Sequence, residues 1–225
     1  MKKFFIAGTD TDAGKTLVAC GLLEAFREKG LSTLALKPVA AGCEETEDGL
    51  RNADALNLMS AMTTSIAYEQ VNPVAVAPPI APHIALEQIN RRVTVSQLAG
   101  FCRGALMTKA DVALIEGAGG WKVPLNDRET LANLAVELQT PVILIVGMKL
   151  GCINHALLTV QSIVQDKLPI AGWIANQIDG DMSCADENFA TLQRWLPGPC
   201  LGRVPNLSDI SFTEVAKYLD VSPLI

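Results

Sequence analysis

Short apolar segments alternate along the chain with longer segments in which apolar residues recur at helical spacing. The apolar segments have almost no polar position within them, which is typical of parallel strands buried on both faces. They predict strands at Lys3–Ala7, Thr33–Lys37, Asp111–Glu116, Pro141–Val146 and Ile170–Asn176. The periodic segments predict helices at Lys15–Lys29, Glu129–Leu138, Asn154–Gln165 and Ala185–Trp195.

This alternation predicts a doubly wound α/β fold: a mostly parallel sheet with helices on both faces and a ligand at the carboxyl ends of the strands. The segment from about residue 43 to 109 is less regular. It contains extended or turning stretches at 71–73 and 78–82, and a helix-like run after Val95. We interpret it as an insertion within a single domain of residues 1–225, and as part of the substrate site.

Composition narrows the class of protein. Hydrophobic residues make up 49% of the 225 residues, which excludes a disordered chain. The net charge of -6 argues against a nucleic-acid surface, so a phosphate site must be local. The six cysteines form no C-x-x-C pair, so we expect neither a zinc site nor a disulfide framework, but a reducing compartment. No segment resembles a signal peptide or a membrane span, and the cytoplasm is the expected location.

A glycine-rich loop, Gly8 to Thr16, joins the first predicted strand to the first predicted helix. Backbone N–H groups in such a loop converge on an anion, and the helix dipole adds to their attraction. Lys15 is placed to reach the β- and γ-phosphates of a nucleotide, and the Thr16 hydroxyl to bind Mg²⁺. Five residues separate Gly8 from Gly14, where the common motif has four. The loop predicts a P-loop NTPase-type fold.

Three further charged residues are candidates whose roles position alone leaves open. Glu116 ends a buried strand before Gly117-Ala118-Gly119-Gly120, where a Walker-B metal ligand belongs, although a solvated strand end is the alternative. Asp54 alone indicates a helix-cap or surface residue. Lys37 follows the second strand as either an exposed surface lysine or a cation that stabilises a transferring phosphoryl group.

These residues, taken with several others, resemble the dethiobiotin synthetase family. The likeness extends in order from residue 8 to about residue 207. It covers the loop Gly-Thr-Asp-Thr-x-x-Gly-Lys-Thr, Lys37-Pro38-Val39-Ala40, residues 49–55, 71–73 and 82–84, Glu116 to Trp121, Lys149-Leu150-Gly151-Cys152-Ile153-Asn154-His155, and the stretches 172–176 and 202–207. The loop and the Gly-Cys-Ile-Asn-His stretch are together specific.

The resemblance implies a ligase of biotin biosynthesis that uses ATP and Mg²⁺. Its substrates are 7,8-diaminopelargonate and CO₂, which first form a carbamate on one amine. The γ-phosphate of ATP is transferred to the carbamate, and the second amine then closes the ring of dethiobiotin with release of ADP and phosphate.

The resemblance also implies roles for individual residues. Lys37, Lys15 and Thr11 are catalytic; Thr16, Asp54 and Glu116 bind the metal. ATP contacts are implied for Asp12, Ala13, Gly14, Lys15, Thr16, Leu17, Asp54, Glu116, Gly117, Ala118, Gly119, Asn176, Gln177, Pro205, Asn206 and Leu207, with Asn176 at the adenine edge. Substrate contacts are implied for Thr11, Lys37, Ala41, Leu150, Gly151, Cys152, Ile153 and Asn154. In the family, a second subunit of a homodimer donates residues 150–154 to the tail carboxylate.

Some positions depart from the family pattern. Ala41 replaces a frequent serine, Ile80-Ala81 replaces a hydroxylic pair, and Gln177 replaces a frequent aspartate. These changes bear on affinity and not on phosphate or metal chemistry. For His155 we favour a structural role at a helix terminus, because no acid or nucleophile is visible beside it.

Other functions stay open on the residues alone. A P-loop ATPase switch of the septum-positioning or plasmid-partition kind carries a signature lysine where this chain has Asp10. A small-molecule kinase would release a stable phosphorylated product, and a third reading is a nucleotide-binding module that has lost its activity. The analysis of reaction products separates these possibilities.

Overall fold

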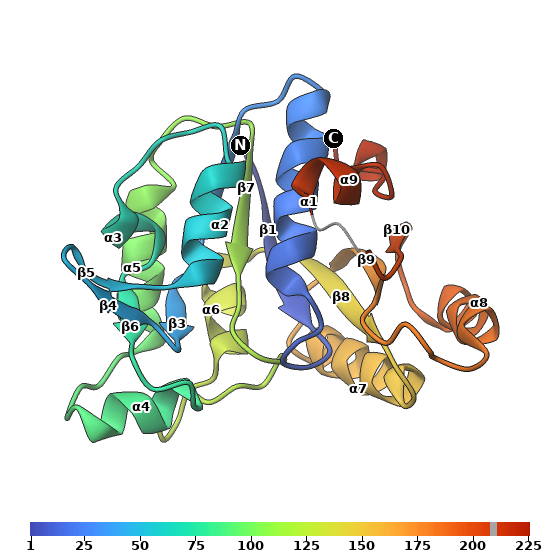
Figure 1. The fold of residues 1–225 in the computed structure, drawn as a ribbon. Coiled ribbons are helices and arrows are strands. Elements are labelled where there is room, and N and C mark those ends of the chain that lie inside the picture. Colours follow the sequence, from blue (N-terminus) through green and yellow to red (C-terminus); the bar gives the residue numbers. More distant parts are fainter. Residues whose placement is uncertain (208–210) are drawn as a thin grey trace.

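The computed structural model describes residues 1–207 and 211–225 and is built on a six-stranded parallel sheet (Figure 1). The strand order is β10-β9-β8-β1-β7-β2, and each adjacent pair is parallel. The strands are β1 (Lys2–Gly8), β2 (Thr33–Leu36), β7 (Val112–Glu116), β8 (Val142–Met148), β9 (Ile170–Gln177) and β10 (Cys200–Val204). The five predicted strands and the doubly wound α/β class are therefore confirmed, while β10 was not predicted.

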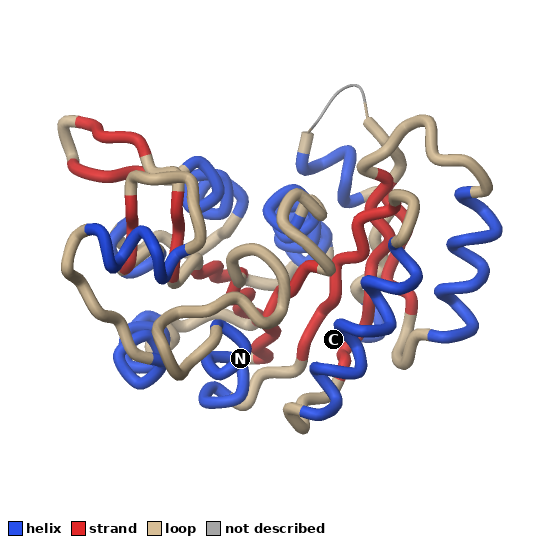
Figure 2. Tube along the Cα trace, turned by 90° about the horizontal axis from the view of Figure 1, so that it is seen from below, coloured by secondary structure: helices blue, strands red, loops and turns tan. Residues whose placement is uncertain are grey.

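Helices cover both faces of this sheet, as Figure 2 shows. On one face lie α1 (Lys15–Glu28), α2 (Ala53–Ala61) and α9 (Phe212–Ala216); on the other lie α5 (Val95–Ala105), α6 (Leu131–Leu138), α7 (Cys152–Gln165) and α8 (Ala185–Trp195). The side chains of strand β1 show why both faces of the sheet are covered. Phe4 and Ile6 pack into the first layer, and Phe5 and Ala7 into the second. Successive side chains of a strand point to opposite faces, so both faces are apolar and both need a cover.

The segment from 43 to 109 is more regular than its sequence indicated. Short strands β3 (Val39–Ala41) and β6 (Val74–Val76) pair in parallel, and β4 (Glu44–Thr46) and β5 (Gly49–Arg51) form a hairpin. Helices α2, α3 (Tyr68–Val71) and α4 (Pro82–Gln88) connect these strands to α5. A periodicity needs more positions than three-residue strands supply, so these elements gave no signal. A short 3₁₀ helix, Ser222–Leu224, ends the described chain.

Two predicted boundaries are wrong for local reasons. Helix α7 begins at Cys152, two positions before the predicted start at Asn154, because Gly151 caps it with a φ of +94°. Helix α6 begins at Leu131 and not at Glu129, because Thr130 is still extended. In the described part of the chain, no helix has both the length and the apolar composition that a bilayer crossing requires.

Glycine at position 21 lets α1 and α9 approach closely, which provides a test of the packing. A Cβ added to Gly21 would lie 3.0 Å from Val215 Cβ, whereas a Cβ added to Gly100, in α5, would meet nothing within 4 Å. Alanine favours a helix over glycine by about 1 kcal/mol at either position. We expect Gly100→Ala to raise the free energy of unfolding, and Gly21→Ala to lower it by about 1–3 kcal/mol through overpacking.

Urea denaturation of the two variants measures this difference. Equal stabilisation by both substitutions would contradict the close packing of α1 against α9.

Candidate active site

The phosphate loop leaves the end of β1 and enters α1 through two left-handed positions. Asp12 has a φ of +58° and Gly14 a φ of +80°. Gly14 is the N-cap of α1, and no side chain caps the helix there, so its first N–H groups are available to an anion. Lys15 is buried and donates a hydrogen bond to the backbone carbonyl of Asp10 at 3.1 Å. The loop thus has the form of a phosphate site with its lysine folded over it.

A cavity of about 800 Å³ opens beside this loop, at the carboxyl ends of β1, β2 and β7. Most of the predicted phosphate, metal and reacting-end residues line it: Thr11, Asp12, Gly14, Lys15, Thr16, Leu17, Lys37, Ala41, Asp54, Glu116, Ala118 and Gly119. Asn52, Pro79, Ile80, Ala81 and Pro82 also line it, and they belong to the segment 43–109 that was interpreted as part of the substrate site. Ala40, Lys122, Val123 and Pro124 line it as well and were not predicted. Their signal in the sequence was their position next to Ala41 or after the glycines that follow β7.

Lys37 lies at the floor of the cavity between two carboxylates. Its Nζ is 2.5 Å from Glu116 Oε1, 2.9 Å from Asp54 Oδ2 and 3.3 Å from the Gly117 carbonyl. The side chain is only 4% exposed, so the surface-lysine alternative is wrong. We call Lys37, Asp54 and Glu116 the charged triad.

Four separate elements place these groups together. Lys37 follows β2, Glu116 ends β7, and Asp54 lies in the first turn of α2. Asn52 caps α2 by accepting a hydrogen bond from the Ala55 N–H, so Asp54 itself is not the cap. From the first turn of α1, the Thr16 hydroxyl donates to Glu116 Oε1 at 2.8 Å. The parallel strands therefore bring to one edge groups that are far apart in the chain.

For Lys37 and Asp54, the effect of ion pairing on the pKa is larger than the opposite effect of burial. Burial alone would lower the pKa of Lys37, but Glu116 and Asp54 overcome it and hold that pKa above its usual value. Burial would raise the pKa of Asp54, yet the neighbouring ammonium keeps that pKa below its ordinary value. For Lys15, burial and the charge of Lys37 both lower the pKa. Lys37 and Asp54 therefore each stabilise the charged form of the other.

The donor atoms around the triad fit a magnesium ion. Glu116 Oε2 is buried and makes no hydrogen bond within the described residues, which leaves one carboxylate oxygen for a further ligand. Asp54 and the Thr16 hydroxyl lie beside it, and all three line the cavity. Among the described residues, no group of three or more His, Cys, Asp or Glu side chains is arranged to hold a metal ion on its own. Two carboxylates and a hydroxyl suit Mg²⁺, which takes its remaining ligands from water and phosphates.

The predicted adenine residues gather on the other side of the phosphate loop. Asn176, at the end of β9, is buried and donates from Nδ2 to the Ala13 carbonyl at 3.0 Å. Any Cβ on residue 14 would overlap this amide, so glycine is required there for space as well as for its positive φ. Asn206 donates to the Gln177 carbonyl at 3.3 Å. The contacts bring these predicted residues together next to the loop, outside the lining of the cavity.

The predicted tail-binding turn, residues 150–154, does not line the cavity of its own chain. Leu150 is 90% exposed, whereas Cys152 is buried. His155 lies in the first turn of α7, its N–H donating to the Gly151 carbonyl and its own carbonyl accepting from the Thr159 hydroxyl. The structural role of His155 stays a prediction.

Comparisons with known proteins agree on a family. The family described as "AAA domain" matches residues 2–214. The ATP-dependent dethiobiotin synthetase BioD of Cellvibrio japonicus (strain Ueda107) is 60% identical over 224 residues, covering 100% of this chain and 98% of the relative. The protein of the same name from Pseudomonas aeruginosa (strain UCBPP-PA14) is 53% identical, with the same coverage of each chain.

Solved structures confirm the P-loop α/β fold. The septum site-determining protein MinD complexed with Mg-ADP from Pyrococcus horikoshii OT3 superposes with a TM-score of 0.58 at 16% identity, covering 98% of this chain and 88% of that chain. A ParA family ATPase from Chlorobium tepidum TLS gives 0.55 at 14% identity, covering 99% and 93%. At such low identity the likeness shows the fold alone.

The buried ion pair of the triad generates a stability prediction. Lys37→Met leaves Glu116, which is 1% exposed, without its cation, and we expect the free energy of unfolding to fall by about 3 kcal/mol. Adding Glu116→Gln removes the unpaired charge and should recover at least about half of that loss. Urea denaturation of both single variants and the double variant measures this coupling. Losses that simply add would show that the two side chains do not depend on each other.

Proposed function

The chain belongs to the family of ATP-dependent dethiobiotin synthetases, which are ligases, and on that premise we propose that it forms dethiobiotin from 7,8-diaminopelargonate and CO₂ with consumption of ATP. The observation that carries this proposal is the charged triad: it lies on the floor of the cavity beside the phosphate loop. Lys37 is the central residue of this proposal. The cavity would bring the triphosphate of ATP close to the carbamate, and the Lys37 ammonium would offset the repulsion between these two anions.

The proposed reaction has three balanced steps. One amine of the substrate adds to CO₂ and loses a proton, which gives a carbamate. A carbamate oxygen attacks the γ-phosphorus, the bond to the bridging oxygen breaks, and ADP leaves. The second amine then attacks the carbamate carbon and loses a proton, and phosphate departs as the ring closes.

Two lysines offset the negative charge that this reaction gathers. A carbamate beside a triphosphate is strongly repulsive, and pre-positioned cations in a partly buried site reduce that cost. Lys15 extends over the phosphate loop toward the nucleotide, and Lys37 bridges the phosphate and the carbamate. Thr11 lines the same cavity and hydrogen-bonds the carbamate end. Ala41 lies beside them without the hydroxyl that the family often has, so the reacting end has one hydrogen-bond donor fewer.

Thr16, Asp54 and Glu116 would hold Mg²⁺ at the triad. When bound, the ion supplies positive charge to the β- and γ-phosphates. In the structure the Lys37 ammonium lies between the two carboxylates and is their counter-cation. A metal held by the same carboxylates would take over that role and would leave Lys37 to contact the substrate.

Asn176 gives the site its preference for adenine. Its Nδ2 donates to the Ala13 carbonyl, which leaves Oδ1 as a hydrogen-bond acceptor. An acceptor suits the exocyclic amine of adenine and not the carbonyl of guanine. Gln177 and the residues Pro205, Asn206 and Leu207 pack around the base.

The tail of the substrate is bound at a subunit interface of a homodimer. The turn at residues 150–154 leads into a long helix, and a helix start attracts a carboxylate. Large apolar side chains are exposed along the turn and α7, with Leu158 at 57% and Val164 at 56%. A second copy of the chain would cover this surface, so each site would combine one chain's cavity with the partner's turn. The reaction takes place in the cytoplasm.

A stable phosphorylated product would instead identify a small-molecule kinase. With diaminopelargonate, bicarbonate and Mg-ATP, we expect dethiobiotin, ADP and free phosphate in equal amounts, identified by mass spectrometry and phosphate assay. Phosphate release without any organic product would favour the ATPase-switch alternative, and a phosphorylated diamine the kinase.

Metal binding in the absence of nucleotide tests whether Lys37 acts as the counter-cation of Asp54 and Glu116. We expect the wild-type protein to bind Mn²⁺ weakly, because the ammonium occupies the carboxylates, and Lys37→Met to bind it about tenfold more tightly. Titration followed by the electron paramagnetic resonance of free Mn²⁺ measures both affinities. The double variant Lys37→Met/Glu116→Gln is the control and should lose the gain. Equal affinities for wild type and Lys37→Met would contradict the role of Lys37 as counter-cation of the two carboxylates, and an undiminished affinity in the double variant would contradict a metal site at the triad.

A further inference from the structure

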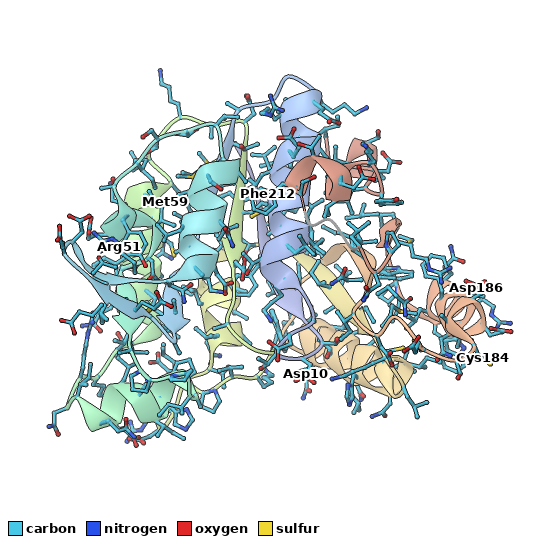
Figure 3. The ribbon with its side chains drawn as sticks, in the orientation of Figure 1. Asp10, Arg51, Met59, Cys184, Asp186 and Phe212 are labelled. Carbon is cyan, nitrogen blue, oxygen red and sulfur yellow. The ribbon has the colours of Figure 1, made fainter. Side chains whose placement is uncertain are left out.

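An ion pair outside the cavity joins the phosphate loop to the turn before α7. Lys149 Nζ lies 2.9 Å from Asp10 Oδ2. The other carboxylate oxygen of Asp10 accepts the Thr11 N–H at 2.8 Å, so one side chain contacts both segments. Figure 3 labels Asp10 in the loop that joins β1 to α1. Neither Asp10 nor Lys149 is among the described residues that line the cavity.

Backbone contacts make the same connection along the length of the two segments. The Thr9 N–H donates to the Ile145 carbonyl at 3.0 Å, and the Gly147 N–H donates to the Thr9 hydroxyl at 3.2 Å. The Cys152 N–H closes the turn on the Lys149 carbonyl at 3.0 Å. The turn is therefore anchored at its base by backbone bonds and at its outer edge by the Asp10–Lys149 pair.

Stability alone does not account for this pair. Lys149 is 36% exposed and Asp10 45%, and ion pairs with that exposure contribute little to folding. The hydrogen bond from Lys149 is nevertheless the main cause that lowers the pKa of Asp10, against the effect of burial.

We propose that Asp10 and Lys149 are positioning residues whose ion pair fixes the turn at residues 149–151 to the phosphate loop of the same chain. The inference rests on the proposed function, in which that turn binds the tail of the substrate held by the neighbouring subunit. The phosphate loop of one subunit thus sets the position of a binding group in the other subunit's site. Lys149 and Asp10 touch no reacting atom.

Steady-state kinetics of matched variants tests this role. Lys149→Met and Asp10→Asn each break the pair, and asparagine keeps an oxygen for the Thr11 N–H. Each should raise the KM for diaminopelargonate about fivefold, with kcat and the KM for ATP within about twofold of wild type. The double variant should resemble either single variant, and Lys149→Arg, which retains the pair, should keep the wild-type KM.

Arg103 and Glu137 provide the control for a generic surface effect. They form a pair of similar length, 2.8 Å, with comparable exposure, between α5 and α6. Arg103→Met should leave the KM for diaminopelargonate unchanged. An equal rise in Arg103→Met, or no rise in Lys149→Met, would overturn the positioning role.

Mixed dimers decide whether the pair acts across the interface. In a dimer of one wild-type subunit and one Lys37→Gln subunit, purified through two different tags, only the wild-type phosphate loop is active. Adding Lys149→Met to the Lys37→Gln subunit should raise the KM about fivefold, because the active site uses that subunit's turn. An unchanged KM would refute action across the interface.

The outcomes separate this inference from the proposed function. A wild-type protein that does not convert diaminopelargonate would refute the function itself. An active monomer would refute the shared site and the inference together. An active dimer with unchanged KM in all variants would refute the inference alone.

Discussion

The structure depends on the burial of one positive charge. Lys37 is almost fully enclosed, and an ammonium in that environment is tolerated only when carboxylates surround it. Glu116 and Asp54 meet this requirement, and they come from β7 and α2, which are held together by the parallel sheet and the segment between β3 and α5. The ion pairs of Lys37 therefore connect the end of β2 with the end of β7 and the start of α2. The cavity lies beside these charged groups.

Much of the fold was predictable because its strands are buried on both faces. Uniform apolar segments identified five of the six strands of the main sheet. Periodicity identified α1, α6, α7 and α8, and the helix-like run after Val95 is α5. Strand β10 was not predicted, because Gly202 and Arg203 interrupt its run of apolar residues. The short pairs β3–β6 and β4–β5 gave no signal, since they exist through contacts with distant segments and not through local preference.

Without the family resemblance, only those site residues that belong to a recognisable sequence motif could be assigned a role. The phosphate loop has a fixed spacing, so Lys15 and Thr16 were identified from sequence alone. Asp54 was identified only through the family resemblance, because its carboxylate reaches the site from the first turn of α2, the helix that Asn52 caps. The cavity wall at Lys122–Pro124 was missed, because side chains far apart in the chain meet there only after folding. The ion pair between Asp10 and Lys149 could not be predicted either, because these two residues come together only in the folded chain.

Gly14 and Asn176 have a consequence for how this chain can vary. The amide of Asn176 occupies the space in which a side chain at position 14 would begin, and the same amide holds the Ala13 carbonyl. A smaller side chain at position 176 would free this space, but the left-handed backbone at position 14 would still favour glycine. The phosphate loop therefore limits variation at the end of a distant strand, whereas variation of that strand cannot release the loop.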